Sequence, residues 1–247
     1  MTATRWGLVA FTLLVVGGAM FRLSSPAHRF PYVTGAPASA TPAGFTEWKL
    51  DGRLRAIKRP PVESQTRWLV FFNGNDEHQV QSGAAFLERV GNGRGLATFA
   101  YRGYDGSDGV PSPDALRADA VRFVEALGVA PAELELVGFS LGAPLAVHVA
   151  AELSRRGTPP RKLTILAAAL ELSMLMPSRL APLLRGDVYA ITADDADALQ
   201  CPVALIHGTD DVALPPSRAL ADRLKTTLTL LNGVDHGSIL RVAELSL

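Results

Sequence analysis

A single cysteine, balanced charge and the absence of metal-binding spacing exclude several classes of function. Its 247 residues include one cysteine, Cys201, so no disulfide can form within the chain, and we interpret this thiol as a small buried apolar group. Basic and acidic residues number 24 each, and neither sign clusters, which leaves no surface for nucleic acid. Histidines and carboxylates show no metal-ligand spacing, and no glycine-rich loop has phosphate-binding form. We therefore expect no metal, no cofactor and no nucleic-acid partner.

The amino terminus differs in kind from the rest of the chain. Residues 6–21 are apolar and uncharged between Arg5 and Arg22, and as a helix they would span about 24 Å, slightly less than a ~30 Å hydrocarbon core. Because flanking arginines can extend to the interfaces, we predict a single-pass membrane anchor over residues 1–23. A signal peptide cleaved after Ala19 is the competing interpretation, and it would make the protein secreted or periplasmic.

The remaining chain is predicted to form a linker and one folded domain. Residues 24–46 are rich in Pro, Ser, Thr, Ala and Gly without sustained periodicity, which favours a linker. In residues 47–247 apolar runs alternate with helical patterns, which is typical of βαβ units. We predict a mostly parallel eight-stranded sheet here, with helices on both faces.

Several local patterns give testable detail. Asp51-Gly52 between two apolar runs predicts a hairpin turn, because both residues accept positive φ angles. Asp76 and Gln79 predict a capping box at the start of a helix over residues 76–90. Ser112 followed by proline predicts the start of another helix.

Residues 170–200 are predicted to form a small cap or lid over the substrate pocket. The segment carries six large apolar side chains: Met174, Leu175, Met176, Leu180, Leu183 and Leu184. Packing of one helix on the core is an equal interpretation, because apolar helical spacing does not distinguish the two.

The most informative motif is GFSLG at 138–142, which follows the apolar run 134–137 and opens a helical pattern. This pattern indicates a nucleophile elbow, in which a serine occupies the apex of a sharp strand-to-helix turn and small neighbours let strand and helix approach. Ser140 is therefore the candidate nucleophile. The first N–H groups of the helix point at the same place and can stabilise negative charge on a substrate oxygen.

Two polar clusters downstream supply a candidate acid and base. One is HGTDDVALP at 207–215, and the other contains His236, after the apolar run 228–231. Because the carboxyl ends of parallel strands share one edge of the sheet, we expect both clusters to meet Ser140 there. His236 is the predicted base and Asp211 the predicted acid, with Asp210 as second candidate. The other histidines of the domain are assigned structural roles: His78, His148 and His207.

Two backbone N–H groups are predicted to form an oxyanion hole. The first belongs to Leu141, directly after the serine at the start of the helix. The second should come from the loop after the apolar run 68–72, which reads Asn73-Gly74-Asn75. Asn75 is the candidate donor there, and Gly74 allows a close approach.

These motifs together resemble the α/β-hydrolase superfamily, and more narrowly its Bem46/ABHD13-like membrane-anchored serine hydrolases. The resemblance covers about residues 47–247 and rests on three stretches beside the elbow: FFNGN at 71–75, YRGYDGSDGVPS at 101–112 and HGTDDVALP at 207–215. It implies that Ser140, Asp211 and His236 form a catalytic triad. Three residues depart from the group's usual pattern: Asn73 in place of the histidine of HGN, and Asp105 and Ala143 in place of glycines.

The implied function is that of a serine hydrolase cleaving carboxylic ester or thioester bonds through an acyl-enzyme on Ser140. The apolar insertion favours a small-molecule or lipid-like ester as substrate, and the N-terminal helix implies a membrane location. Two alternatives stay open, because a fold does not fix a reaction. One is a membrane-tethered binding protein without turnover, and the other is an aminopeptidase or acyltransferase on the same fold.

Overall fold

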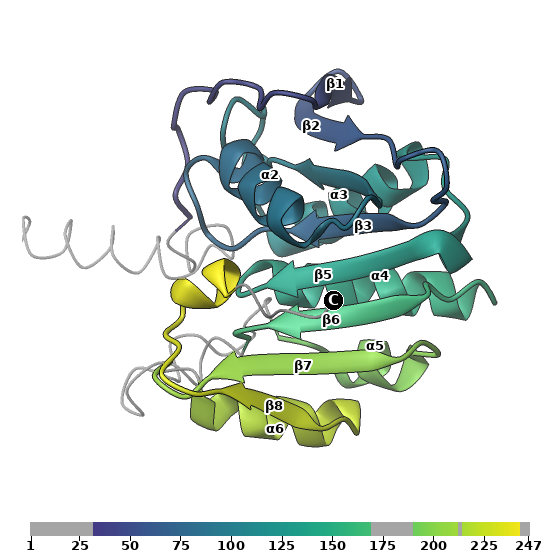
Figure 1. The fold of residues 1–247 in the computed structure, drawn as a ribbon, viewed down its shortest axis with the longest axis vertical. Helices are drawn as coiled ribbons and strands as arrows, with labels where there is room; N and C mark the ends of the chain where they lie inside the picture. Colours follow the sequence, from purple (N-terminus) through teal and green to yellow (C-terminus); the bar gives the residue numbers. More distant parts are fainter. Residues whose placement is uncertain (1–31, 169–189, 212–213, 243–247) are drawn as a thin grey trace, which may run out of the picture.

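The computed structural model describes residues 32–168, 190–211 and 214–242. Eight strands form one sheet in the order β1-β2-β4-β3-β5-β6-β7-β8 (Figure 1). β1 (Thr46–Leu50) and β4 (Gly95–Phe99) both pair antiparallel with β2 (Leu54–Arg59). The remaining neighbours are parallel and include β3 (Trp68–Phe72), β5 (Leu134–Phe139), β6 (Lys162–Leu166), β7 (Val203–Gly208) and β8 (Leu228–Leu231). The predicted mostly parallel eight-stranded sheet is confirmed.

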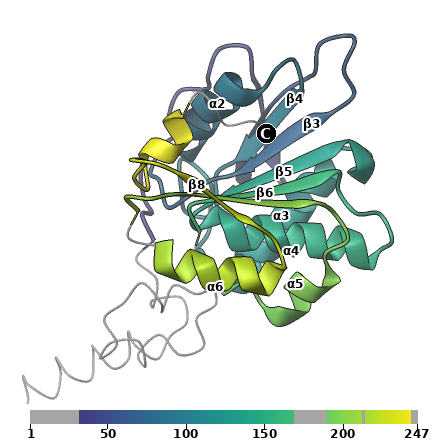
Figure 2. The same ribbon diagram turned by 60° about the horizontal axis from the view of Figure 1, so that its bottom comes forward.

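Helices cover both faces of the sheet, as predicted (Figure 2). One face carries α2 (Gln79–Val90) and the short 3₁₀ helix η5 (Ser238–Arg241). The other face carries α3 (Pro113–Ala126), α4 (Gly142–Arg155), α5 (Ala193–Ala198) and α6 (Leu214–Leu224). A further 3₁₀ helix, η2 (Pro131–Glu133), leads into β5. Because both faces are covered, the central strands β3 and β5 are apolar and buried along almost their whole length.

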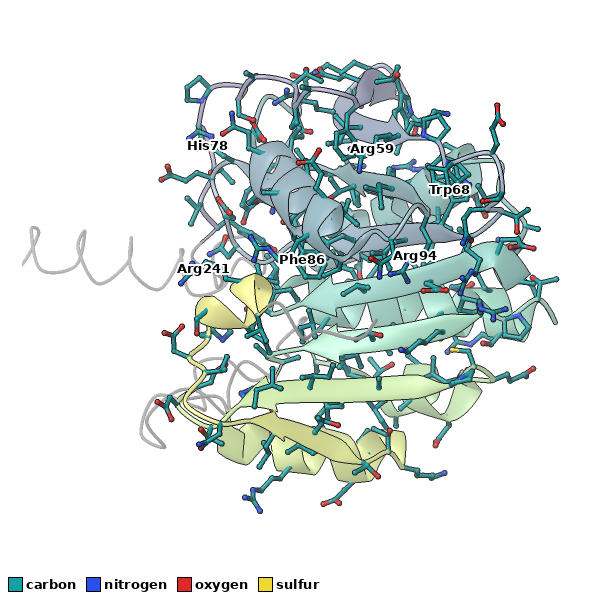
Figure 3. All side chains as sticks on the ribbon, in the orientation of Figure 1. Arg59, Trp68, His78, Phe86, Arg94 and Arg241 are labelled. Atoms are coloured by element: carbon teal, nitrogen blue, oxygen red, sulfur yellow. The ribbon has the colours of Figure 1, made fainter. Side chains whose placement is uncertain are left out.

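Figure 3 shows which side chains lie at the amino ends of the parallel strands and which lie at their carboxyl ends. Trp68 begins β3, and with Arg94 it lies near the amino ends of the strands. His78, at the start of α2, and Arg241, at the end of η5, lie near the opposite edge, where the carboxyl ends meet. Residues that follow the parallel strands therefore collect at one edge of the molecule.

Two of the three local predictions are confirmed and one is wrong. The β1–β2 hairpin turns at Asp51 and Gly52, whose φ angles are 50° and 69°, and the Ser112 side chain caps α3. The predicted capping box is absent because α2 begins only at Gln79 and its N-cap residue has no side-chain cap. The Gln79 side chain instead donates to the Gly74 carbonyl and accepts from the Tyr101 N–H. Tertiary partners therefore replace the local cap.

The predicted membrane anchor over residues 1–23, with its cleavage alternative, lies outside the described residues. In the described ranges, no helix is long and apolar enough to span a bilayer. The described part of the predicted linker, 32–45, runs along the domain: the Gly35 N–H donates to the Gly103 carbonyl at 2.9 Å, and Phe45 is buried in the core. The boundary between linker and domain stays a prediction, and the first strand begins at Thr46.

Most of the predicted lid, residues 170–189, also lies outside the described residues. In the described remainder, Ile191 is buried and α5 packs against α4 and α6. An ion pair between Arg155 and Asp195, 2.9 Å apart, joins α4 to α5. For residues 190–200 the interpretation as part of the helical layer on the core therefore fits, and no lid is seen in this part.

Candidate active site

Ser140 lies between β5 and α4 in the strained turn that the motif predicts. Its φ angle is +49°, in the left-handed region that non-glycine residues rarely adopt. The flanking glycines are needed for space: a Cβ atom on Gly138 would lie 2.7 Å from the Ala143 Cα, and one on Gly142 would lie 2.1 Å from the Phe72 carbonyl oxygen. The turn thus brings the serine to the carboxyl end of the central strand, directly at the start of a helix.

Ser140, His236 and Asp211 meet at this edge. The His236 Nε2 lies 3.0 Å from the Ser140 Oγ, and the Nδ1 lies 2.7 Å from the Asp211 Oδ2. Because the Asp211 carboxylate can only accept, the Nδ1 carries the proton and the Nε2 can accept from the serine hydroxyl. The Asp211 side chain is fully buried, whereas that of His236 is 43% exposed. This arrangement orients a histidine so that it can remove the serine proton.

Asp210, the second candidate for the acid, has another position. It is exposed, and its Oδ1 accepts from the Thr209 hydroxyl at 3.0 Å. Its backbone N–H donates to the Val234 carbonyl, in the loop that leads to His236. Asp210 is therefore a turn residue that links the exit loops of β7 and β8.

The loop that carries His236 is held tightly against the end of β7. The Thr209 N–H donates to the Leu231 carbonyl at 3.0 Å, and the Gly233 N–H donates to the Thr209 hydroxyl at 2.8 Å. A Cβ on Gly208 would lie 1.9 Å from the Val234 carbonyl oxygen, so only glycine allows this approach. The ring of His236 also packs beside Phe139, with centroids 5.1 Å apart. Backbone contacts therefore fix the histidine relative to the serine.

The loop 73–75, which carries the candidate donor Asn75, lies beside the serine. A Cβ on Gly74 would lie 3.5 Å from the Ser140 Cβ, which places the loop 73–75 beside the nucleophile. Leu141 is the N-cap residue of α4, and within the described ranges its backbone N–H has no hydrogen-bond acceptor. The structure therefore brings the 73–75 loop and the start of α4 to the same atom. The donor roles of Asn75 and Leu141 stay predictions.

Buried hydrogen bonds fix this loop. Asn73, one of the departures from the resembled group, donates its side-chain amide to the Gln79 carbonyl at 2.9 Å and to the Thr98 hydroxyl at 3.0 Å. The Tyr101 hydroxyl donates to the Asn73 carbonyl at 2.7 Å. Burial raises the pKa of Tyr101 well above its ordinary value, so the hydroxyl stays protonated and remains a donor. The sequence pattern did not predict these contacts of Gln79 and Tyr101, although YRGY follows a strand that ends at this edge.

The remaining histidines have other surroundings. His207 is fully buried, with its Nδ1 2.7 Å from the Ser217 Oγ and its Nε2 3.1 Å from the Asp211 Oδ2, outside hydrogen-bond geometry. His148 pairs with Asp195 of α5 at 3.0 Å. His78 lies at the start of α2 (Figure 3). Among the described residues, no group of three His, Cys, Asp or Glu side chains could hold a metal ion.

Comparisons with known proteins show what the chain is similar to. Residues 124–236 match the model of the FSH1 serine hydrolase family. The chain is 27% identical over 172 residues to lysophosphatidylserine lipase ABHD12 of Danio rerio, and 27% identical over 169 residues to Protein ABHD12B of Homo sapiens. Each alignment covers 60% of this chain, but only 44% and 46% of the respective relative. The chain thus spans less than half the length of these curated relatives.

Solved structures show the same fold. An alpha-beta hydrolase from Vibrio vulnificus aligns with a TM-score of 0.65 at 16% identity, over 80% of this chain and 76% of that one. Carboxyl esterase 2 from the fungus Tuber melanosporum aligns with a TM-score of 0.58 at 14% identity, over 94% and 92%. A monoacylglycerol lipase from Paleococcus ferrophilus aligns with a TM-score of 0.58 at 21% identity, over 74% and 90%.

The fold is that of the α/β hydrolases, and residues 124–236 are similar to a serine hydrolase family. These matches place the similarity of the chain within the α/β-hydrolase superfamily. The narrower resemblance to the Bem46/ABHD13-like group stays a prediction.

Proposed function

We propose that the protein hydrolyses carboxylic ester or thioester bonds through an acyl-enzyme on Ser140. The observation that carries this proposal is the continuous chain of contacts from the Ser140 Oγ through His236 to the buried Asp211. A serine hydroxyl is a weak nucleophile until a base removes its proton, and an oriented imidazole is the usual base.

In the first step the Ser140 Oγ attacks the substrate carbonyl carbon while the His236 Nε2 takes the hydroxyl proton. Asp211 holds the Nδ1–H and stabilises the imidazolium that forms. The bond to the leaving alcohol or thiol then breaks, and His236 gives that group its proton. An acyl group remains on the serine.

In the second step a water molecule gives a proton to His236 and attacks the acyl carbonyl. Collapse of this intermediate releases the carboxylic acid and restores the serine hydroxyl. In both steps the carbonyl oxygen becomes an oxyanion, which the backbone N–H groups of Asn75 and Leu141 stabilise. Each such donor contributes roughly 3 kcal/mol in comparable sites. No cofactor takes part.

The substrate class is a lipid-like ester. One matched relative is named as a lysophosphatidylserine lipase and one structural neighbour as a monoacylglycerol lipase, and both names refer to lipid esters. The apolar side chains of residues 170–200 would suit such a chain. A membrane location through residues 1–23 would place the site near a lipid surface, and the segment 170–189 would cap the pocket.

The test uses the purified full-length protein with p-nitrophenyl esters of graded acyl length. We expect turnover that favours longer chains, and Ser140→Ala should lower kcat/KM by at least about 10³-fold. Ser154→Ala, which removes another buried hydroxyl of α4, is the matched control and should keep activity within a few-fold. A fluorophosphonate probe should label the wild type and not Ser140→Ala.

Three results would contradict the proposal. Full activity in Ser140→Ala would remove the assigned nucleophile. Absence of both turnover and labelling in the folded wild type would favour the binding protein without catalysis. Faster cleavage of amides than of matched esters would favour the peptidase.

A further inference from the structure

Part of the predicted linker contacts the loop that carries the proposed oxyanion donor Asn75. We call residues 32–39 the strap. The Val33 N–H donates to the Asn75 Oδ1 at 3.1 Å, and the Tyr104 hydroxyl donates to the same oxygen at 2.6 Å. Tyr32 of the strap packs edge-on against Tyr104, with ring centroids 6.4 Å apart. One side-chain oxygen of Asn75 is thus held by the strap and by the YRGY segment together.

Tyr104 is suited to be a permanent donor. It is fully buried, and burial raises its pKa above the ordinary value, so its hydroxyl stays protonated across the working pH range. Two donors on one amide oxygen restrict the Asn75 side chain, and through it the orientation of the backbone at that residue.

Asp105 fastens the strap to the domain. Its Oδ1 accepts from the Ser39 N–H at 2.6 Å and from the Arg55 guanidinium at 2.9 Å. Its Oδ2 accepts from the Ser39 hydroxyl at 3.0 Å and from the Val80 N–H in the first turn of α2 at 2.8 Å. The side chain is wholly buried, and the φ angle of +41° is one that favours glycine. An aspartate at this position therefore contributes a carboxylate that joins strap, strand and helix.

We propose that the strap positions the oxyanion loop, with Val33, Tyr104 and Asp105 acting as positioning residues through Asn75. The inference rests on the proposed function, which assigns the Asn75 backbone N–H to the oxyanion. The oxyanion forms only as the substrate reacts. Loss of the strap's contacts with the domain should therefore lower kcat and leave KM nearly unchanged.

The experiment measures kcat and KM of full-length variants with a p-nitrophenyl ester. Val33→Pro removes the strap donor, and Tyr104→Phe removes the second donor without touching the strap. Each should lower kcat by about three- to tenfold, the effect of one hydrogen bond, with KM within about twofold. Ala43→Pro is the matched proline control: it occupies the second position of the turn closed by the bond from Phe45 N–H to the Pro42 carbonyl, where proline fits. It should keep kcat within about twofold of the wild type.

A double-mutant cycle separates positioning from a general structural effect. If Val33→Pro acts through Asn75, it should have no further effect on kcat in an Asn75→Ala background. Independent, multiplicative effects would overturn the inference, as would wild-type kcat in both Val33→Pro and Tyr104→Phe. A loss of thermal stability with unchanged kcat would overturn it too. Failure of the proposed function has a different outcome, because the wild type itself would then show neither turnover nor probe labelling.

Discussion

Replacing Gly142 by alanine tests how closely the proposed nucleophile elbow, residues 138–142, and the 73–75 loop are joined. Gly142 is the first residue of α4, and a Cβ there would lie 2.1 Å from the Phe72 carbonyl oxygen and 2.5 Å from the Asn73 carbonyl oxygen. Both are backbone atoms at the end of β3, so no side chain can move aside. Because Cβ atoms essentially never approach within 3.0 Å, the two segments must separate by roughly 1 Å.

The separation has two measurable consequences. Overpacking of this kind lowers the free energy of unfolding by about 1–3 kcal/mol. The higher helix propensity of alanine, ~1 kcal/mol relative to glycine, offsets part of this loss. The second concerns activity: a displacement of about 1 Å between Leu141 and the 73–75 loop would misplace two proposed oxyanion donors. A shift of that size can lower the rate by about 10²-fold.

The assay combines ester hydrolysis with urea unfolding of Gly142→Ala. Gly237→Ala is the control, because its φ of −83° suits alanine and the nearest atom to a Cβ there, the Asp235 Oδ1, lies 3.8 Å away. We expect the control to match the wild type in both measurements. A Gly142→Ala protein with kcat within about threefold of wild type and unchanged unfolding free energy would refute the close contact at the elbow.

Two further predictions concern stability and reactivity away from the nucleophile. Burial opposes ionisation of Asp195, but hydrogen bonds from His148 and Arg155 outweigh it and lower its pKa from 3.8 to about 2. The carboxylate therefore contributes roughly 2 kcal/mol to the free energy of unfolding above pH 4. This contribution is lost as the pH falls through 2. Asp195→Asn should lose this amount at pH 7 in urea unfolding, whereas the exposed Asp194→Asn should not; equal losses would contradict the assignment. Burial raises the pKa of the Cys201 thiol to about 11, so native protein should react with iodoacetamide at pH 8 far more slowly than unfolded protein, and equal rates would refute this.

Local signals predicted the parts of the molecule whose causes are local. The Asp51-Gly52 turn, the cap of α3 and the elbow at Ser140 each depend on residues next to one another in sequence, and all three are present. The alternation of apolar runs and helical patterns was sufficient to predict the sheet, because only a parallel arrangement buries such runs on both faces.

Long-range contacts account for what the sequence pattern left open or got wrong. Asp210 and Asp211 are adjacent and chemically alike, and only the paths of β7 and β8 bring Asp211 to His236. Gln79 fits a capping box by spacing, yet its amide meets the Gly74 loop and Tyr101 instead.

The chain by itself determines that a serine stands at a strained strand-to-helix turn, because that requirement lies within five consecutive residues. It does not determine which side chains surround that serine, nor that residues 32–45 lie against the domain. Those contacts join residues tens of positions apart, as Val33 and Asn75 show. They form only once burial of the core has brought the strand ends to a common edge.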